Sequence, residues 1–211
     1  MCEDPTQKKI IRQEIKSYKD MGNLKKIEQE YNGMFTVDEE AFFENAHIEK
    51  GINKDLDWKY EEQDVPCSIG IDYGGVNAET AITVVGQYKE GLRLLFKFSR
   101  ADFDYNKLMD RGWEHSISSL FKRYNVYHVV VDDCSMGVQC NKWLETEGYP
   151  VLKFNFRSDA ASSERNRGYY IFRSYLTKGH IQYPNDKKLT SQMKTIQEKI
   201  GRAHVWTPVT T

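Results

Sequence analysis

Two places in the sequence carry acidic residues directly after a short apolar stretch. Asp72 follows residues 67–71 (CSIGI), and the pair Asp132 and Asp133 follows residues 126–131 (VYHVVV). Apolar runs of this kind are typical of strands buried on both faces, and ligands of open α/β sheets gather at the carboxyl ends of such strands. If the two strands are neighbours, their carboxylates can hold a divalent cation, because Mg2+ and Mn2+ prefer oxygen ligands.

The chemistry that fits such a site is hydrolysis of a phosphodiester bond. Two ions about 4 Å apart activate the attacking water and stabilise the leaving oxygen. We expect Asp72 to bridge two Mg2+ or Mn2+ ions and Asp132 to bind one, with Asp133 as the competing choice. Clustered carboxylates repel one another, so their pKa values should be raised, and metal binding should release protons. An aspartate before two glycines is also typical of an ordinary turn, and this alternative stays open.

The elements that must position these acids follow from the periodicity of the apolar residues. Strands are predicted at 67–72, 80–88, 92–98, 126–131 and 150–156, and helices at 104–124, 138–147 and 163–178. The order β-β-β-α-β-α-β-α is that of the α/β ribonuclease H-like fold, with a mixed sheet. Right-handed crossover places the fourth strand beside the first. That adjacency would bring Asp72 and Asp132 together.

The first 65 residues show a different pattern. A helix is predicted from Pro5 to Met21, and residues 38–64 are strongly acidic without a clear period, which favours a linker or a wrapping segment. We therefore expect a short helical linker region at 1–65 and a ribonuclease H-like domain at 66–199.

Composition narrows the class of protein. The chain has 211 residues, 39% of them hydrophobic, and a net charge of -1, so it can form a folded core and carries no global basic signature. Its four cysteines form no CxxC pair, which argues against a disulfide framework or a structural zinc. No apolar run reaches the roughly 20 residues of a membrane span.

A local basic stretch runs from Lys153 to Lys178. We expect it to contact the phosphate backbone of a nucleic acid downstream of the acidic site. The residues chosen for this role are Lys153, Arg157, Arg165 and Arg167. A merely solvated helix surface is the alternative.

Several short motifs, taken together, resemble the nuclease domain of the large terminase subunit of tailed double-stranded DNA viruses. They are residues 30–35 (EYNGMF), 42–43 (FF), 70–72 (GID), 131–132 (VD), 135–137 (SMG) and 178–184 (KGHIQYP), with Leu189. The resemblance implies a Mg2+- or Mn2+-dependent endonuclease that cuts concatemeric viral DNA during packaging. It also implies double-stranded DNA, a portal protein and a small terminase subunit as partners, and a place in the host cytoplasm.

Carried over to this sequence, the resemblance implies that Asp72 and Asp132 are metal ligands, with Asp133 as the choice if the register differs by one residue. The third acidic ligand of the family lies on a helix beyond the strand at Tyr183. Nothing in this chain matches it, because Asp159 and Asp186 lie in other segments.

The two ends of the chain also depart from the family pattern. No GxxxxGK[ST] phosphate loop precedes the linker, so residues 1–65 are expected to include a remnant of an ATPase domain, and this chain alone is not expected to drive translocation. Residues 200–211 resemble the conceptual translation of a sequencing adapter, and we expect a non-native tail there.

Three other functions remain open at this stage. Residues 69–75 (IGIDYGG) also resemble the first phosphate loop of sugar kinases and other actin-like ATPases, but no second glycine-rich loop follows. Another ribonuclease H-like nuclease, such as a junction resolvase, would share the metal site. A non-catalytic module that holds DNA or docks on the portal would need no third acidic ligand.

Overall fold

The structure is a computed structural model that describes residues 5–21, 40–58, 62–74, 78–133, 137–154 and 164–198. The predictions for Arg157, for Asp159 and for the tail at 200–211 lie outside these residues. For Arg165 the structure describes the backbone alone.

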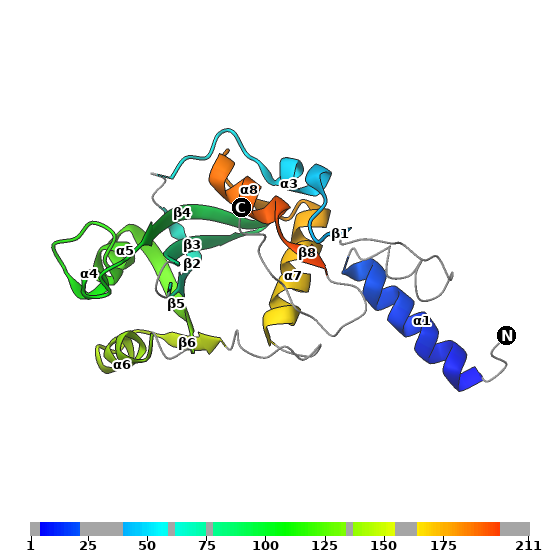
Figure 1. Cartoon of the computed structure of the whole chain (residues 1–211), viewed down its shortest axis with the longest axis horizontal. Coiled ribbons are helices and arrows are strands. Elements are labelled where there is room, and N and C mark those ends of the chain that lie inside the picture. The colour runs from blue at the N-terminus through cyan, green and yellow to red at the C-terminus, as the bar shows by residue number, and fades with distance from the viewer. Residues whose placement is uncertain are drawn as a thin grey trace.

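A six-stranded mixed sheet forms the centre of the fold, in the order β6-β5-β2-β3-β4-β7 (Figure 1). Strands β2, β3 and β4 form an antiparallel meander, and β5 lies parallel to β2 on its other side. Strand β6 is parallel to β5, and β7 is parallel to β4. The bounds are β2 (Glu62–Asp72), β3 (Glu79–Tyr88), β4 (Gly91–Ala101), β5 (Tyr124–Asp132), β6 (Val151–Phe154) and β7 (Ile181–Gln182). The predicted meander and the predicted place of the fourth strand beside the first are confirmed.

One face of this sheet, which we call the core face, carries the main hydrophobic core. Successive side chains of a strand point to opposite faces, so alternate residues of the central strands are buried here. These residues are Ile69, Ile71, Ile82, Val84, Val129 and Val131. Their partners are Leu108 of α4 (Asn106–Met109), Ile117 and Leu120 of α5 (Ile117–Arg123), and Leu144 of α6 (Val138–Thr146).

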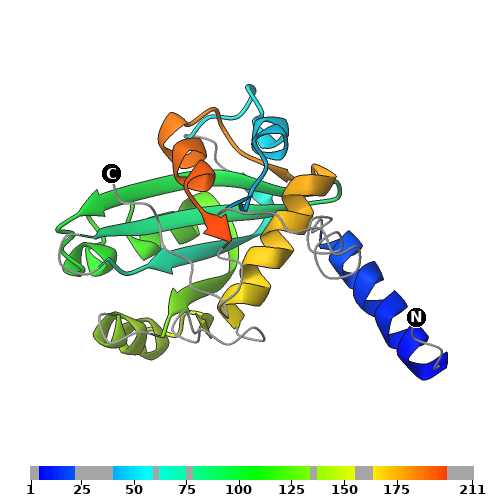
Figure 2. The ribbon, with the colours of Figure 1, turned by 45° about the vertical axis from the view of Figure 1, so that its right-hand side comes forward.

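The opposite face, which we call the acid face, carries smaller and more polar side chains. Gly70, Ala81, Thr83 and Ser99 are half-buried there. Helices α7 (Glu164–Lys178) and α8 (Lys187–Lys194) pass in front of the sheet in Figure 2, whereas α5 lies behind it. The two faces therefore differ in character, with packing on one and accessible polar groups on the other.

A second hydrophobic cluster joins residues 40–58 to the last helices. Phe42, Phe43 and Ile48 are at most 2% exposed and pack against α7 and α8 through Leu176 and Met193. Ile48 belongs to α3 (Asn45–Gly51), and β1 (Glu40–Ala41) pairs with β8 (Gln197–Glu198). This part of the predicted linker or wrapping segment is thus packed on the end of the sheet.

Helix α1 (Pro5–Asp20) extends away from the sheet in both ribbon views. The Oγ of Ser174 donates a hydrogen bond to its last carbonyl, that of Asp20, at 2.8 Å. Among the described helices, none combines the length and the apolar character needed to cross a bilayer.

The prediction of one long helix at 104–124 is wrong. The chain forms two short helices, α4 and α5, and Tyr124 already begins β5. The Oδ1 of Asp110 accepts a hydrogen bond from the Gly112 amide at 2.9 Å, and the Oγ of Ser116 accepts one from Ser119 at 3.3 Å, which caps α5. These local hydrogen bonds favour a turn and a new helix start over one continuous helix.

Candidate active site

The two predicted acidic residues end two neighbouring parallel strands. Register between β2 and β5 runs through Gly70 with Val130 and Ile71 with Val131, so the next aligned pair is Asp72 with Asp132. Aligned residues on adjacent strands project from the same face of a sheet. Both carboxylates therefore belong to the acid face, at the carboxyl edge of the sheet.

The electrostatics of this pair disfavour ionisation of Asp72. Burial and then the negative charge of Asp132 raise the pKa of Asp72 above the usual aspartate value. The Asp72 side chain is nevertheless exposed to solvent. Asp132 is only 8% exposed, and its Oδ1 is buried without a hydrogen-bond donor among the described residues. A buried carboxylate oxygen without a partner is costly, and a hard cation would satisfy it.

Asp133, the competing choice, does not join the pair. It follows Asp132 directly, so its side chain projects away from the acid face. Its amide donates to the Phe154 carbonyl at 3.0 Å, which continues the pairing with β6, and its side chain is exposed. Its charge helps to raise the pKa of Lys153 on that side, after the larger effect of Glu145. The register thus favours Asp132 over Asp133 as the partner of Asp72.

A third acidic ligand is not found among the described residues, where no group of three His, Cys, Asp or Glu side chains is placed to hold a metal. Asp186 has a structural role instead. Its Oδ1 accepts the Leu189 amide at 2.9 Å and caps α8, and its Oδ2 lies 2.7 Å from the ammonium of Lys97. Burial raises the pKa of Asp186, but these contacts outweigh burial and lower it overall.

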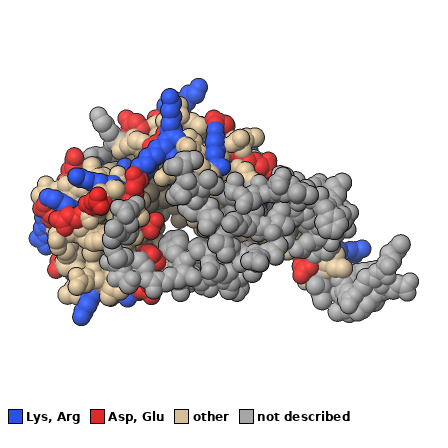
Figure 3. Space-filling view, in the orientation of Figure 1, with Lys and Arg blue, Asp and Glu red and all other residues tan. Residues whose placement is uncertain are grey.

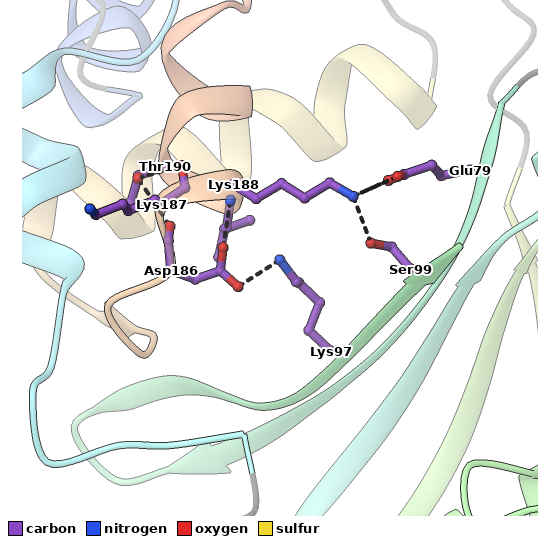
Figure 4. Close-up of polar contacts among 8 residues, drawn as sticks. Glu79, Lys97, Ser99, Asp186, Lys187, Lys188 and Thr190 are labelled. Atoms are coloured by element: carbon purple, nitrogen blue, oxygen red, sulfur yellow. Dashed lines mark hydrogen bonds and ion pairs between the residues drawn. The ribbon is translucent and has the colours of Figure 1, made fainter. Parts of the chain in front are cut away.

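Glu79 is a neighbouring acid that the sequence reasoning missed. It lies on the acid face, two residues from Ala81, which is the partner of Asp72 in β3. Its carboxylate is held by Lys188 of α8, at 2.5 and 2.6 Å, and this ion pair lowers its pKa (Figure 4). Lys188 also donates to Ser99 at 3.2 Å. Together with the ion pair between Lys97 and Asp186, these contacts fix α8 over β3 and β4.

A hydrogen-bonded chain connects the two strand ends through α6. The hydroxyl of Tyr73 donates to Oδ1 of Asn141 at 2.8 Å, and Nδ2 of Asn141 donates to the Asp132 carbonyl at 3.0 Å. Tyr73 and Asn141 are at most 5% exposed. The residue after Asp72 is thereby tied to Asp132 itself, which fixes the relative position of the two acids.

Close packing supports this chain. A Cβ atom on Gly137 would lie 2.2 Å from the Tyr73 ring, so only glycine fits at the start of α6. Tyr105 donates its hydroxyl to the Gly74 carbonyl and packs edge-on against Tyr73, with centroids 5.6 Å apart. The sequence signal for Asn141 is a polar residue between Cys140 and Leu144 on the buried side of a predicted helix.

The predicted nucleic-acid residues separate into two groups. Lys153 aligns with Val131 and therefore lies on the core-face side, where it pairs with Glu145 at 2.8 Å. Arg167 is exposed on α7, next to Gly168, whose added Cβ would lie 3.2 Å from the ring of Phe154. Phe154 aligns with Asp132, so this end of α7 lies beside the acids on the acid face. Arg167 thus belongs to the helix that lies on the acid face, whereas Lys153 lies on the other side of the sheet.

Charge is otherwise mixed over the surface. On the side drawn in Figure 3, basic and acidic side chains of the described residues are interspersed. Binding of a polyanion therefore depends on local groups rather than on a general positive potential.

The fold is a ribonuclease H-like α/β domain, and the acid pair forms a candidate cation site at the carboxyl edge of its sheet. Comparison with solved structures places this fold among phage large terminase nucleases. The chain superposes on the large terminase nuclease from thermophilic phage G20c with a TM-score of 0.64 and 14% identity, covering 81% of this chain and 89% of that one. The magnesium-bound form of that nuclease gives a TM-score of 0.60 and 16% identity, covering 74% and 80%.

Terminases of other phages give the same result. The large terminase nuclease domain of Thermus phage P74-26 matches with a TM-score of 0.56 and 16% identity, covering 75% of this chain and 86% of that one. Against the large terminase of another thermophilic bacteriophage, the match has a TM-score of 0.56 and 14% identity, and covers 78% of this chain but 39% of that protein. No protein-family model and no curated protein matches the sequence. At these identities the likeness establishes the fold.

Removing the charge of Asp72 should stabilise the metal-free protein. The raised pKa means that the folded state disfavours the ionised carboxylate of Asp72. This carboxylate therefore does not destabilise the fold below the ordinary aspartate pKa of about 3.9. Its destabilising effect grows as the pH rises through the raised pKa. We expect Asp72→Asn to raise the Tm at pH 7 by the equivalent of less than about 1 kcal/mol, because solvent screens the exposed side chain. The gain should vanish in acid.

Mn2+ should reverse the order of the Tm values of the wild type and Asp72→Asn. It should raise the Tm of the wild type but not of Asp72→Asn, since a ligand that binds the folded state stabilises it. Asp133→Asn serves as the matched control and should respond to Mn2+ like the wild type. An equal Mn2+ effect on all three proteins would contradict the placement of the cation.

Loss of Asn141 should weaken the cation site as well as the fold. Asn141→Ala leaves the Tyr73 hydroxyl and the Asp132 carbonyl without this partner, and we expect a loss of about 1–3 kcal/mol in urea unfolding. The Mn2+-induced rise in Tm should shrink in parallel. Ile48→Val, in the second cluster, should cost about 0.5–1.5 kcal/mol and leave the Mn2+ effect intact. A full Mn2+ effect in Asn141→Ala would show that the residue supports packing alone.

Proposed function

We propose that this chain is the nuclease part of a large terminase subunit and cuts concatemeric double-stranded viral DNA during genome packaging. The observation that carries the proposal is the buried Oδ1 of Asp132, which lacks a donor among the described residues and aligns with the charged Asp72. A cation would satisfy this buried oxygen and offset the charge of the pair. The similarity of fold to phage nucleases adds support, since the G20c structures are described with bound magnesium, zinc and cobalt.

The residues present fit Mg2+ or Mn2+, because both groups offered are carboxylates. When bound, two such ions would activate a water and stabilise the leaving oxygen of the phosphodiester. The exposed Asp72 and the buried Asp132 would together hold the metal, with Asp72 on the side open to the substrate. Because the described residues provide no third acid, we expect this chain to bind metal weakly and to cut slowly.

DNA would lie along the acid face in this proposal. Arg167 would contact phosphates on the β6 side of the acids. Lys153 is not included, since it lies on the other side and is neutralised by Glu145. In the packaging complex, a portal protein and a small terminase subunit would be partners, and the host cytoplasm would be the place of action.

Supercoiled plasmid and Mn2+ provide the test of the activity. We expect slow nicking by the wild type, its loss in Asp72→Ala and Asp132→Ala, and its retention in Asp133→Ala, because the Asp133 side chain projects away from the pair. Retained nicking in Asp72→Ala would overturn the assignment. ATP hydrolysis without nicking would instead favour the actin-like ATPase.

The salt dependence of DNA binding tests the path of the backbone. Each phosphate contact contributes about -0.9 to the slope of log K against log salt. Arg167→Glu should weaken binding of a short duplex and reduce the magnitude of this slope by about 1. Lys153→Glu changes the charge equally on the other side of the sheet and should leave the slope unchanged. The reverse pattern would move the DNA to the core-face side.

A further inference from the structure

A pocket of about 270 Å³ lies between residues 103–109 and the start of α6, at the end of the sheet that carries the acidic site. Its apolar wall consists of Phe103, Tyr105, Met109 and Cys140. Asp104, Asn106 and Gln139 provide the polar groups. Helices α4 and α6 lie at the same end of the sheet in Figure 1.

The wall of the pocket is continuous with the site. Tyr105 bonds to the carbonyl of Gly74, two residues after Asp72, and Cys140 precedes Asn141, which bonds to Asp132. Helices α4 and α6 pack on the core face, so the pocket and the acids lie on opposite sides of this sheet edge. A strand with one phosphate at the acids reaches the pocket where its end crosses the edge.

The chemistry of the lining selects a neutral, flat group. No lysine or arginine is among the lining residues, and the carboxylate of Asp104 would repel a phosphate. The volume is below the roughly 300–1,000 Å³ of pockets for drug-sized ligands, so the occupant is small. Two aromatic rings offer a surface for stacking, and two amides with one carboxylate offer donors and acceptors for the edge of a heterocycle.

The pocket is also held in shape before any ligand enters. Phe103 packs against Phe98 and Trp113, each with a centroid distance of 5.5 Å. Asn106 donates two hydrogen bonds to Oδ1 of Asp104, one from its backbone N–H at 3.0 Å and one from its side-chain Nδ2 at 2.9 Å. A preorganised surface loses less entropy when it binds.

We propose that this pocket binds one unpaired nucleobase of the DNA strand that is cut at the acidic pair. The inference rests on the proposed function, because the base belongs to the strand whose phosphate lies at Asp72 and Asp132. A base in a frayed or single-stranded end enters without breaking a stacked pair, which otherwise costs a few kcal/mol. Stacking on aromatic rings tolerates every base, so such a pocket would hold the strand in place without sequence specificity.

Short single-stranded oligonucleotides with one abasic nucleotide at successive positions provide the test, with binding measured by anisotropy in EDTA. For one position, the missing base should weaken binding to the wild type about 5- to 150-fold, the range for one stacked base. Phe103→Leu should bind the intact strand more weakly by a similar factor and lose nothing further at that position. If the losses of affinity caused by Phe103→Leu and by the abasic nucleotide add up at every position, the proposal is overturned. Failure of the wild type to bind the oligonucleotide would also overturn it.

A second pair of variants tests the pocket independently, in case Phe103→Leu fails to fold. Gln139→Trp fills the pocket from an exposed helix position, whereas Thr146→Trp places the same side chain at the other end of α6. The first should abolish the response to the abasic position, and the second should keep it. Equal responses in both would overturn the pocket assignment.

Plasmid nicking by the same proteins separates the two proposals. Nicking by the wild type without any abasic response refutes the pocket alone. The other outcome is a wild type that does not nick plasmid with Mn2+ but shows the abasic response, with Gln139→Trp abolishing that response. This outcome refutes the nuclease proposal and leaves the base-binding pocket.

Discussion

The hydrogen bonds of Asn141 are the constraint on which the site depends. Two parallel strands bring Asp72 and Asp132 to one edge, but strand ends are free to separate where the ladder stops. Asn141 prevents this by accepting from Tyr73 and donating to the Asp132 carbonyl, all within a buried environment. Two like charges are thereby held together against their repulsion. The free energy that opposes this repulsion comes from the core face, where α6 is packed.

The two faces of the sheet have different roles in holding the site. Aliphatic side chains on the core face anchor α4, α5 and α6, whereas small side chains on the acid face leave room for a ligand. Helix α8 is attached to the acid face by the second hydrophobic cluster, through Met193, and also by ion pairs of Lys97 with Asp186 and of Lys188 with Glu79 (Figure 4).

How much the sequence could predict differs between the strands and the site. The strands and the acids at their ends were predictable, because apolar runs that stop at a charge are a local signal. The choice between Asp132 and Asp133 was not, since a shift of one residue reverses the face of a strand and only the pairing with β2 fixes it. The predicted long helix failed because the apolar period continued through residues that Asp110 and Ser116 turn by local hydrogen bonds. The Lys188–Glu79 pair joins residues 109 positions apart and has no local signal.

Neutralisation of charge distinguishes the acid pair from the other acids on the same face. Glu79 and Asp186 lie on the same face, but Lys188 and Lys97 pair with them, and the pKa of each is lowered. Among the described residues, neither Asp72 nor Asp132 has such a partner, and the pKa of Asp72 is raised. An edge selected for stability alone would be expected to carry a third lysine that neutralises the pair, as Lys188 and Lys97 neutralise Glu79 and Asp186. The unneutralised pair, fixed in place by a buried amide, is instead the arrangement expected of a site that exchanges protons for a divalent ion.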